Sequence, residues 1–295
     1  MAGVGGLTFA EMVAAAAGYR PYAYQERLAA EGLPDLLRVP TGGGKTLAAA
    51  MPWLYRRRFH PDRDVRRATP RWLVVVLPQR ALVEQTVDVV AGWLAEIGVG
   101  EDVAVHVLMG GVSPDDRVWK MYPSRDAIFV GTQDMVLSRL LLRGYAEPRA
   151  AWPVAFGLLH AHAQFVFDEV QLMGPALGTS LQLQGLRELL GTVAPTRSMW
   201  MSATVSVESL STADFLGPDS VVELSEADRR GPLRTRLEAT RLIERIDVPG
   251  DPKHYARTLA DFAVRRHAPG TRTIVIANTV ERACQVYDAV IAARR

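Results

Sequence analysis

A glycine-rich segment near the start of the chain, Pro40-Thr41-Gly42-Gly43-Gly44-Lys45-Thr46, has the residue types of a phosphate-binding loop. Glycines let the backbone curl so that successive N–H groups face an anion, and the Lys45 ammonium can bind a nucleotide's outer phosphates. The Thr46 hydroxyl can bind Mg²⁺, although Val39 stands where the strict pattern has another glycine. The segment predicts a nucleoside triphosphate site built from Thr41, Gly42, Gly43, Gly44, Lys45 and Thr46.

An acidic pair, Asp168-Glu169, follows an apolar run further along the chain. In a Mg²⁺–nucleotide site one carboxylate holds the metal and another orients and deprotonates the attacking water. Alone, the pair is a common surface turn, but with Gly44-Lys45-Thr46 upstream it becomes a specific signal. We therefore predict Glu169 and Lys45 as catalytic residues, and Thr46 and Asp168 as Mg²⁺ ligands. This prediction requires the two groups to share one pocket.

Two further polar groups are placed where they could serve the same site. Gln25 precedes the glycine-rich segment, and its amide could read an adenine edge with one donor and one acceptor. The alternative for Gln25 is an exposed residue at a helix start. Ser202-Ala203-Thr204 ends another apolar run, and we expect Ser202 and Thr204 to sense the phosphate and relay its state.

Continuous apolar runs precede nearly all of these polar groups, as is typical of strands covered on both faces of a parallel sheet. Segments with helical character separate the runs, so the sequence predicts an open α/β sheet, in which ligands bind outside the carboxyl ends of the strands. The predicted strands are 36–39, 72–77, 103–108, 126–130, 164–167 and 198–201.

The chain divides by composition into three parts. Residues 1–212 form the predicted nucleotide-binding lobe, and residues 213–232, where Ser, Asp, Glu, Gly and Pro accumulate, are interpreted as a linker. Residues 233–295 begin a second unit, with strands expected within 233–246 and at 273–277 and helices at 254–267 and 280–295. Two strand–helix units are too few for an independent domain, so we expect this second lobe to be incomplete.

Composition limits the remaining possibilities. The 295 residues are 48% hydrophobic and 22% charged, which is typical of globular proteins, and the net charge of +2 confines any nucleic-acid contact to a local groove. Cys284 is the sole cysteine, which excludes disulfides within the chain and cysteine-based zinc sites. No apolar run approaches the roughly 20 residues of a membrane span. We expect a soluble, cytoplasmic protein without membrane contact.

The order of the phosphate loop, Asp168-Glu169-Val170-Gln171 and Ser202-Ala203-Thr204 resembles superfamily 2 helicases. Further segments resemble the helicase part of the CRISPR-associated helicase-nuclease of type I systems, most closely the type I-G (formerly I-U) form. These segments are Trp152-Pro153-Val154, Phe156-Gly157-Leu158-Leu159-His160, Asp168-Glu169-Val170-Gln171-Leu172-Met173-Gly174 and, for the first second-lobe motif, Ile276-Ala277-Asn278-Thr279-Val280.

The resemblance implies a RecA-like sheet flanked by helices (a P-loop NTPase), followed by the start of a truncated second RecA-like lobe. It also implies ATP and Mg²⁺ as cofactors. The activity implied is ATP-driven translocation on single-stranded DNA after a guide-RNA effector complex has opened its target. Gln171 stands where the family often has histidine, and we expect its amide to couple the acidic pair to the Ser-Ala-Thr motif.

The resemblance also assigns residues to the path of the nucleic-acid strand. Backbone N–H groups, hydroxyls and an arginine can hold phosphates without reading bases. The residues implied are Pro78, Gln79, Arg80, Gly110, Gly111, Thr132, Gln133 and Asp134, with Asn278 and Thr279 from the second-lobe motif.

Several family features are missing from this sequence. The nuclease of this family needs clustered His and Asp ligands, and no His-Asp pair occurs here. His160 and His162 are interpreted as structural. Later second-lobe motifs, including the arginine finger, are also missing, so we expect this chain alone to bind ATP weakly and hydrolyse it poorly. Two alternatives remain: a nucleotide-binding interaction module that unwinds nothing, and a general superfamily 2 RNA helicase.

Overall fold

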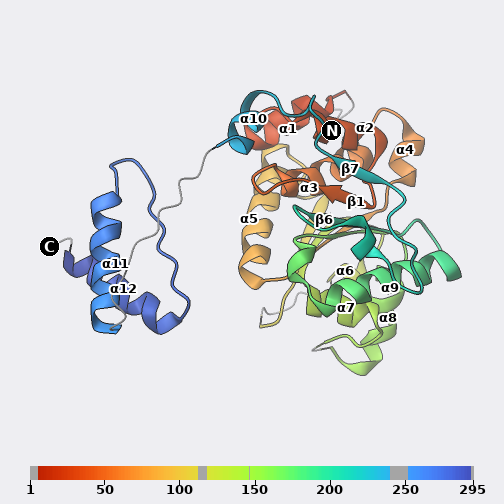
Figure 1. Cartoon of the computed structure of the whole chain (residues 1–295). Coiled ribbons are helices and arrows are strands. Elements are labelled where there is room, and N and C mark those ends of the chain that lie inside the picture. Colours follow the sequence, from red (N-terminus) through yellow and green to blue (C-terminus); the bar gives the residue numbers. More distant parts are fainter. Residues whose placement is uncertain (1–5, 112–117, 146, 240–251, 294–295) are drawn as a thin grey trace. The chain divides into compact units, whose positions relative to one another are not determined.

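The computed structural model describes residues 6–111, 118–145, 147–239 and 252–293. These residues belong to two compact units, 1–239 and 240–295, each of which is considered by itself (Figure 1).

The first unit is built on a parallel sheet, as the sequence predicted, and the sheet has seven strands where six were predicted. The strand order is β3-β4-β2-β5-β6-β1-β7, and all pairs are parallel. The bounds are β1 Leu36–Arg38, β2 Trp72–Leu77, β3 Val103–Leu108, β4 Asp126–Thr132, β5 Ala163–Phe167, β6 Arg197–Ser202 and β7 Val221–Glu223. Because every strand runs the same way, the polar residues that follow the strands collect at one edge of the sheet.

Helices cover both faces of this sheet (Figure 1). One face packs against α1 (Phe9–Ala17), α2 (Ala23–Glu31), α3 (Lys45–Leu54) and α5 (Arg80–Glu96). The other packs against α6 (Val118–Met121), α7 (Gln133–Leu140), α8 (Trp152–Leu159) and α9 (Pro175–Leu190). The remaining helical segments of this unit are η1 (Tyr55–Phe59), α4 (Arg63–Ala68), η2 (Arg149–Ala151), η3 (Val170–Leu172), η4 (Val207–Leu210) and α10 (Gly231–Leu237).

Alternate residues of the central strands point into two separate cores, which explains their unbroken apolar sequence. In β2, Leu73 and Val75 join the core under α3 and α5, whereas Val74 and Val76 join the core under α7 and α9. All six residues of β2 are buried. A strand covered on both faces has no position where a polar side chain could meet water.

The segment interpreted as a linker, 213–232, belongs to the first unit instead. Residues 221–223 form β7, which pairs with β1 and extends the sheet. The helix α10 follows, and its Leu233 is fully buried in the first core. The unit ends at Ala239. This edge strand has three residues and an exposed face, so its composition could not be distinguished from that of a connector.

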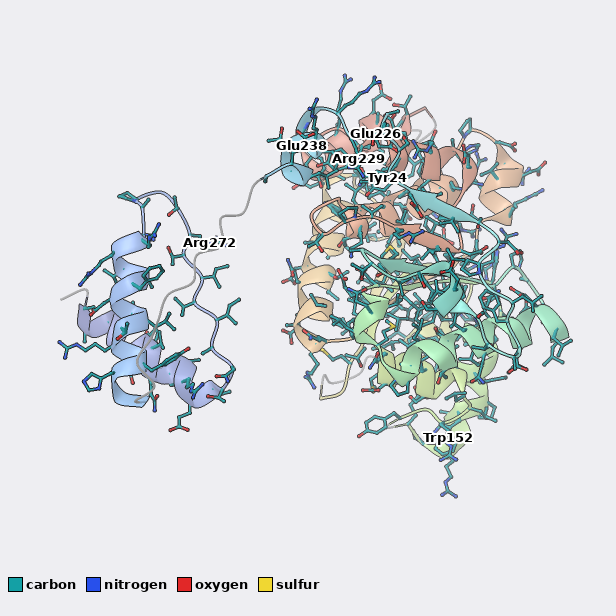
Figure 2. The ribbon with its side chains drawn as sticks, in the orientation of Figure 1. Tyr24, Trp152, Glu226, Arg229, Glu238 and Arg272 are labelled. Carbon is teal, nitrogen blue, oxygen red and sulfur yellow. The ribbon has the colours of Figure 1, made fainter. Side chains whose placement is uncertain are left out.

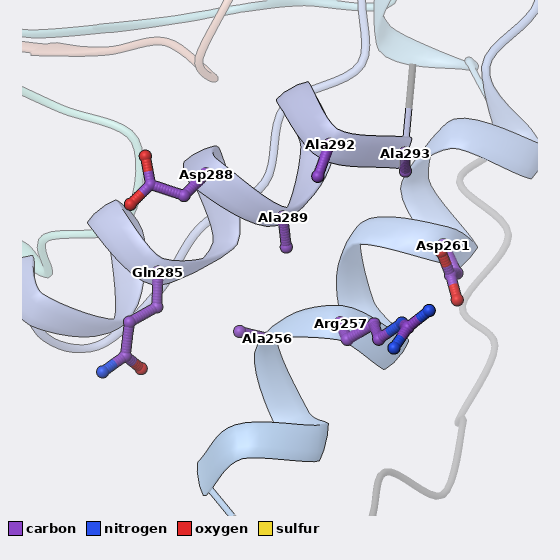
Figure 3. Close-up of a pocket in the computed structure, with 8 residues that line it drawn as sticks. All are labelled: Ala256, Arg257, Asp261, Gln285, Asp288, Ala289, Ala292 and Ala293. Atoms are coloured by element: carbon purple, nitrogen blue, oxygen red, sulfur yellow. The ribbon is translucent and has the colours of Figure 1, made fainter. Parts of the chain in front are cut away.

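The second unit contains α11 (Pro252–Arg266) and α12 (Val280–Ala293), close to the helices predicted there. A pocket of about 690 Å³ lies between them, lined by four alanines together with Arg257, Asp261, Gln285 and Asp288 (Figure 3).

The two strands expected in the second unit are not found among the described residues. Residues 233–237 lie in α10, and 240–246 fall outside the described part. Residues 273–277 are not a strand, and Ile274 and Ile276 are 74% and 86% exposed. A strand exists only through hydrogen bonds to a neighbour, so an apolar sequence alone was insufficient. Across the described helices of both units, none is long and apolar enough to cross a membrane.

Candidate nucleotide and nucleic-acid site

The glycine-rich loop connects the end of β1 to the start of α3. Gly42 and Gly44 have φ of 84° and 81°, in the left-handed region that glycine adopts without strain. A β-carbon at Gly43 would lie 2.3 Å from Cγ1 of Val39. Val39, the departure from the strict pattern, therefore packs directly against a loop glycine, and α3 starts at Lys45 with its N-terminus toward the loop.

The loop lysine and the acidic pair meet in one place. Lys45 Nζ lies 2.6 Å from Glu169 Oε1 and 3.9 Å from Asp168 Oδ1. Lys45 is 7% exposed, and Thr46, the next residue, is half-buried. Loop and acidic pair lie 124 positions apart in sequence and follow β1 and β5, which flank β6. The structure thus brings together the two groups that the sequence prediction required to share a pocket.

The two carboxyl groups have different electrostatic surroundings. Burial raises the pKa of Asp168 to about 6, against the opposing effect of Lys45. Burial also acts to raise the pKa of Glu169, but hydrogen bonds from Lys45 and Gln171 outweigh it and lower that pKa below its ordinary value. Glu169 is therefore held ionised, whereas burial makes the ionised form of Asp168 less favourable.

A chain of hydrogen bonds joins the acidic pair to the Ser-Ala-Thr motif. Gln171 Nε2 donates to Glu169 Oε2 at 2.6 Å, and Ser202 Oγ donates to Gln171 Oε1 at 2.7 Å. The Ser202 oxygen accepts from the backbone N–H groups of Thr204 and Val205, each at 3.1 Å. The Gln171 amide thus uses one donor and one acceptor to link the ends of β5 and β6, and the coupling role predicted for it stays a prediction.

Gln25 is buried and supports the loop from the side of α2. It is 1% exposed, which contradicts the alternative of an exposed residue. Its Oε1 accepts from Tyr22 N at 2.8 Å, and its Nε2 donates to the Gly44 carbonyl at 3.0 Å. In this structure the amide therefore contacts the loop backbone, and the predicted adenine contact stays a prediction.

Sequence reasoning missed Tyr24, which is fully buried in the first unit (Figure 2). Its hydroxyl donates to the Gly43 carbonyl at 2.5 Å. The only signal was an aromatic residue next to Gln25, and nothing in the pattern indicated that its hydroxyl would reach the loop. Tyr24 and Gln25 together fix two consecutive carbonyls of the phosphate loop.

The residues predicted on the strand path within the first unit all lie at the carboxyl edge of the sheet. Pro78 and Gln79 follow β2, and Arg80 is the first residue of α5; Gly110 and Gly111 come shortly after β3, Thr132 ends β4, and Gln133 and Asp134 begin α7.

Two contacts define this edge more closely. A β-carbon at Gly111 would lie 3.7 Å from Arg80 Nη2, so the guanidinium lies beside that glycine. Gln133 Oε1 is buried and has no hydrogen-bond partner among the described residues. The edge therefore presents a guanidinium and an unsatisfied acceptor.

Asn278 and Thr279 lie in the second unit, at the start of α12. Asn278 Oδ1 accepts from Arg282 Nη1 at 3.0 Å, and Thr279 Oγ1 accepts from Arg282 N at 3.3 Å. These bonds cap and brace α12, and the predicted nucleic-acid role of both residues stays a prediction.

His160 serves the packing of the first unit, as the sequence interpretation favoured. Its Nδ1 accepts from Arg187 Nε at 3.2 Å, which leaves Nε2 to donate to the Leu140 carbonyl at 3.1 Å. Burial, and then the charge of Arg187, lower the pKa of His160 to about 4, so the ring is neutral. Within the described ranges, no three His, Cys, Asp or Glu side chains are grouped to hold a metal ion.

The parallel sheet, the loop after β1 and the acidic pair after β5 define a RecA-like nucleotide-binding domain. Residues 22–213, more than half of the chain, match the family model described as DEAD/DEAH box helicase. The chain belongs to the DEAD/DEAH box helicase family, and this region is an ATP-dependent helicase domain. The resemblance to superfamily 2 helicases is thereby confirmed.

Curated relatives carry the name ATP-dependent RNA helicase DBP10. The protein of Yarrowia lipolytica is 28% identical over 224 residues, 75% of this chain and 20% of the relative. That of Pyricularia oryzae is 30% identical over 201 residues, covering 68% of this chain and 18% of the relative. The chain thus spans about a fifth of these relatives.

Solved helicase structures share the fold. The DUF1998 helicase MrfA is 16% identical with a TM-score of 0.64, covering 97% of this chain and 40% of that one. A variant of Dbp5 from S. cerevisiae is 17% identical with a TM-score of 0.54, covering 97% of this chain and 63% of that one. At these identities the likeness concerns the fold alone. None of the relatives named here is a CRISPR protein.

Proposed function

We propose that the first unit binds ATP with Mg²⁺ between the glycine-rich loop and the acidic pair, and uses its hydrolysis to work on single-stranded nucleic acid. The single observation that carries this proposal is the 2.6 Å contact of Lys45 Nζ with Glu169 Oε1. It brings a phosphate-binding cation within reach of a carboxylate that can orient water.

The residues of the site fit Mg²⁺. The Thr46 hydroxyl and the Asp168 carboxylate are hard oxygen ligands of the kind this ion prefers. Burial raises the pKa of Asp168, and a divalent cation beside its carboxylate would stabilise the ionised form. When bound with ATP, the ion would neutralise charge on the transferred phosphoryl group.

The remaining steps belong to the protein's own groups. Lys45 leaves Glu169 to contact the phosphates, and Glu169 becomes available to orient and deprotonate water. Gln171 stays bonded to Glu169 and to Ser202, so a shift of the carboxylate reaches the end of β6. We infer that this connection couples the nucleotide state to the nucleic-acid edge.

The comparisons favour RNA as the nucleic acid, because the curated relatives are named RNA helicases. A second candidate is the motor of a type I CRISPR helicase-nuclease, acting on single-stranded DNA together with a guide-RNA effector complex. It is supported by the sequence resemblance of residues 152–154, 156–160 and 168–174.

Glu169→Gln tests the proposal. The amide oxygen can still accept from Lys45, so binding of a fluorescent ATP analogue should persist. Single-turnover hydrolysis should fall about 10²–10⁴-fold, because the general base is lost. Glu96→Gln, at the exposed end of α5, is the control and should change neither quantity.

Hydrolysis by Glu169→Gln at the wild-type rate, or no nucleotide binding by the wild-type chain, would overturn the proposed site. Activation by single-stranded RNA and not by DNA would favour the RNA helicase, and the reverse would favour the CRISPR motor. If the chain binds nucleotide but neither RNA nor DNA activates hydrolysis, the result would favour the nucleotide-binding interaction module.

A further inference from the structure

An arginine pocket lies at the amino-terminal end of the sheet, away from the nucleotide site. Its volume is about 300 Å³, and it is lined by Arg57, Arg58, Arg63, Arg66, Arg67 and Asp126. Asp126 begins β4, whereas Thr132 ends the same strand at the nucleotide edge. Six residue steps of about 3.3 Å separate the two ends, so the pocket lies roughly 20 Å along β4 from the strand path.

Local structure gathers these arginines. The π-helical turn η1 continues α3 and carries Arg57 and Arg58 over the start of β4. Asp62 caps α4 by accepting from Asp64 N at 2.7 Å. In α4, positions 63, 66 and 67 are spaced i, i+3 and i+4, so their side chains share one helix face, with β-carbons about 5–6 Å apart.

The charges in the pocket are not balanced. Asp126 is 7% exposed and pairs with Arg57 at 2.8 Å and Arg58 at 3.0 Å. Arg58 also contacts Asp102 at 3.0 Å. Five guanidinium groups and one carboxylate therefore line the pocket, although the whole chain has a net charge of only +2.

The outer arginines of α4 differ in how they are engaged. Arg66 Nη1 donates to backbone carbonyls of His60 and Pro61, which holds the wall of the pocket. Arg63 and Arg67 are exposed, and within the described ranges neither side chain makes a hydrogen bond or ion pair. The pocket therefore presents two guanidinium groups whose donors face solvent.

We propose that the arginine pocket binds the phosphodiester backbone of nucleic acid, as a second contact surface separate from the strand path. Guanidinium forks fit phosphate oxygens bidentately. The spacing of the α4 arginines suits neighbouring phosphates of one strand. Contacts to phosphate oxygens carry no base information, so binding at the pocket is expected to be independent of sequence.

This inference rests on the proposed function in one respect: a helicase domain already holds nucleic acid that can extend to another face. A strand or duplex arm leaving the carboxyl edge would be retained by the pocket. An acidic protein segment would present carboxylates instead, and the experiment below separates the two.

The test is Arg63→Gln combined with Arg67→Gln in the full chain. Affinities for a 30-mer duplex DNA, single-stranded DNA and single-stranded RNA are measured by fluorescence anisotropy without ATP, over a salt titration. Removing two phosphate contacts should lower the slope of log affinity against log salt by about 1.8 for duplex or 1.4 for single strands, and weaken binding about tenfold at 0.1 M salt.

The matched control is Arg229→Gln with Arg230→Gln, two exposed arginines outside the pocket, which should leave affinity and slope unchanged. Binding of the fluorescent ATP analogue and the melting temperature should be unaltered in both double variants. An unchanged slope in the pocket variant, or an equal loss in the control, would overturn the proposal.

Loss of binding to polyglutamate, with nucleic-acid binding intact, would assign the pocket to an acidic protein and also overturn it. Failure of the proposed function looks different: the wild-type chain would then bind no nucleotide, or Glu169→Gln would hydrolyse it at the wild-type rate, whatever the salt slopes show. If wild-type and pocket variant bind nucleic acid alike, only the second surface is refuted.

Discussion

Replacing Asp168 with asparagine should stabilise the ligand-free protein at neutral pH while abolishing its Mg²⁺-dependent hydrolysis. Burial raises the pKa of this carboxyl from 3.8 to about 6. A raised folded-state pKa means that the folded protein binds the proton more tightly than the unfolded chain. Asp168 therefore destabilises the fold least at a pH below its unfolded-state pKa. The destabilisation grows as the pH rises and reaches its full size once the pH is above about 6.

The magnitude follows from the shift. Two pKa units correspond to about 3 kcal/mol, which is the cost of holding Asp168 ionised in the folded state at pH 8. Asparagine avoids this cost and keeps the acceptor for the Glu169 N–H, which lies 2.8 Å from Asp168 Oδ1. At pH 5 the Asp168 carboxyl is mostly ionised in the unfolded chain and mostly protonated in the folded protein. The gain in stability from asparagine therefore falls to about half of its value at pH 8.

Urea unfolding of wild type and Asp168→Asn at pH 5 and pH 8 measures the difference in their free energies of unfolding directly. For a unit of this size, about 3 kcal/mol corresponds to a rise of roughly 6–12 °C in the melting temperature at pH 8. Asp88→Asn, at an exposed position of α5, is the control and should change stability little at either pH. The reasoning is refuted if Asp168→Asn is less stable than wild type at pH 8, or if its gain is equal at both pH values.

Three further outcomes are expected. Ser202→Ala removes the donor to Gln171, so binding of the ATP analogue should persist while activation of hydrolysis by nucleic acid falls about fivefold or more; full activation would show that this bond carries no coupling. Tyr24→Phe removes the hydroxyl that holds the Gly43 carbonyl and should weaken nucleotide affinity about five- to tenfold in a fluorescence titration; unchanged affinity would mean that the loop keeps its shape unaided. Chelation of Mg²⁺ should weaken nucleotide binding at least tenfold, because Lys45 cannot neutralise both the phosphates and the acidic pair; equal affinity with and without the ion would contradict this.

The sheet could be predicted from the sequence because its central strands are buried on both faces. A run such as 72–77 has no polar position, and the motif after each strand marks its carboxyl end. The edge strand β7 lacked both signals, since it has three residues and pairs on one side only. In 273–277 the apolar pattern was present, yet no strand partner accompanies it among the described residues.

The candidate site could be predicted where one residue type does one kind of chemistry. Lys45, Asp168 and Glu169 were identified in this way, and the structure places them together. Gln25 and Tyr24 show the limit of this approach. An amide or a phenol can contact a base, a backbone or water, and only the fold shows that both contact the loop carbonyls. The arginine pocket could not be predicted from the sequence at all, because its excess of positive charge depends on which carboxylates the fold places near each arginine.

The contacts of Lys45 explain why the site should respond to nucleotide as a unit. Without ligand, its ammonium is the one cation within ion-pair distance of Asp168 and Glu169 among the described residues. Moving that charge to a phosphate leaves two carboxylates facing each other, an arrangement that burial makes unfavourable. Either a proton or a divalent cation must then reach Asp168, and Glu169 must depend more on Gln171. Because Gln171 is already bonded to Ser202, charge redistribution at the phosphates and rearrangement at the end of β6 become parts of one equilibrium.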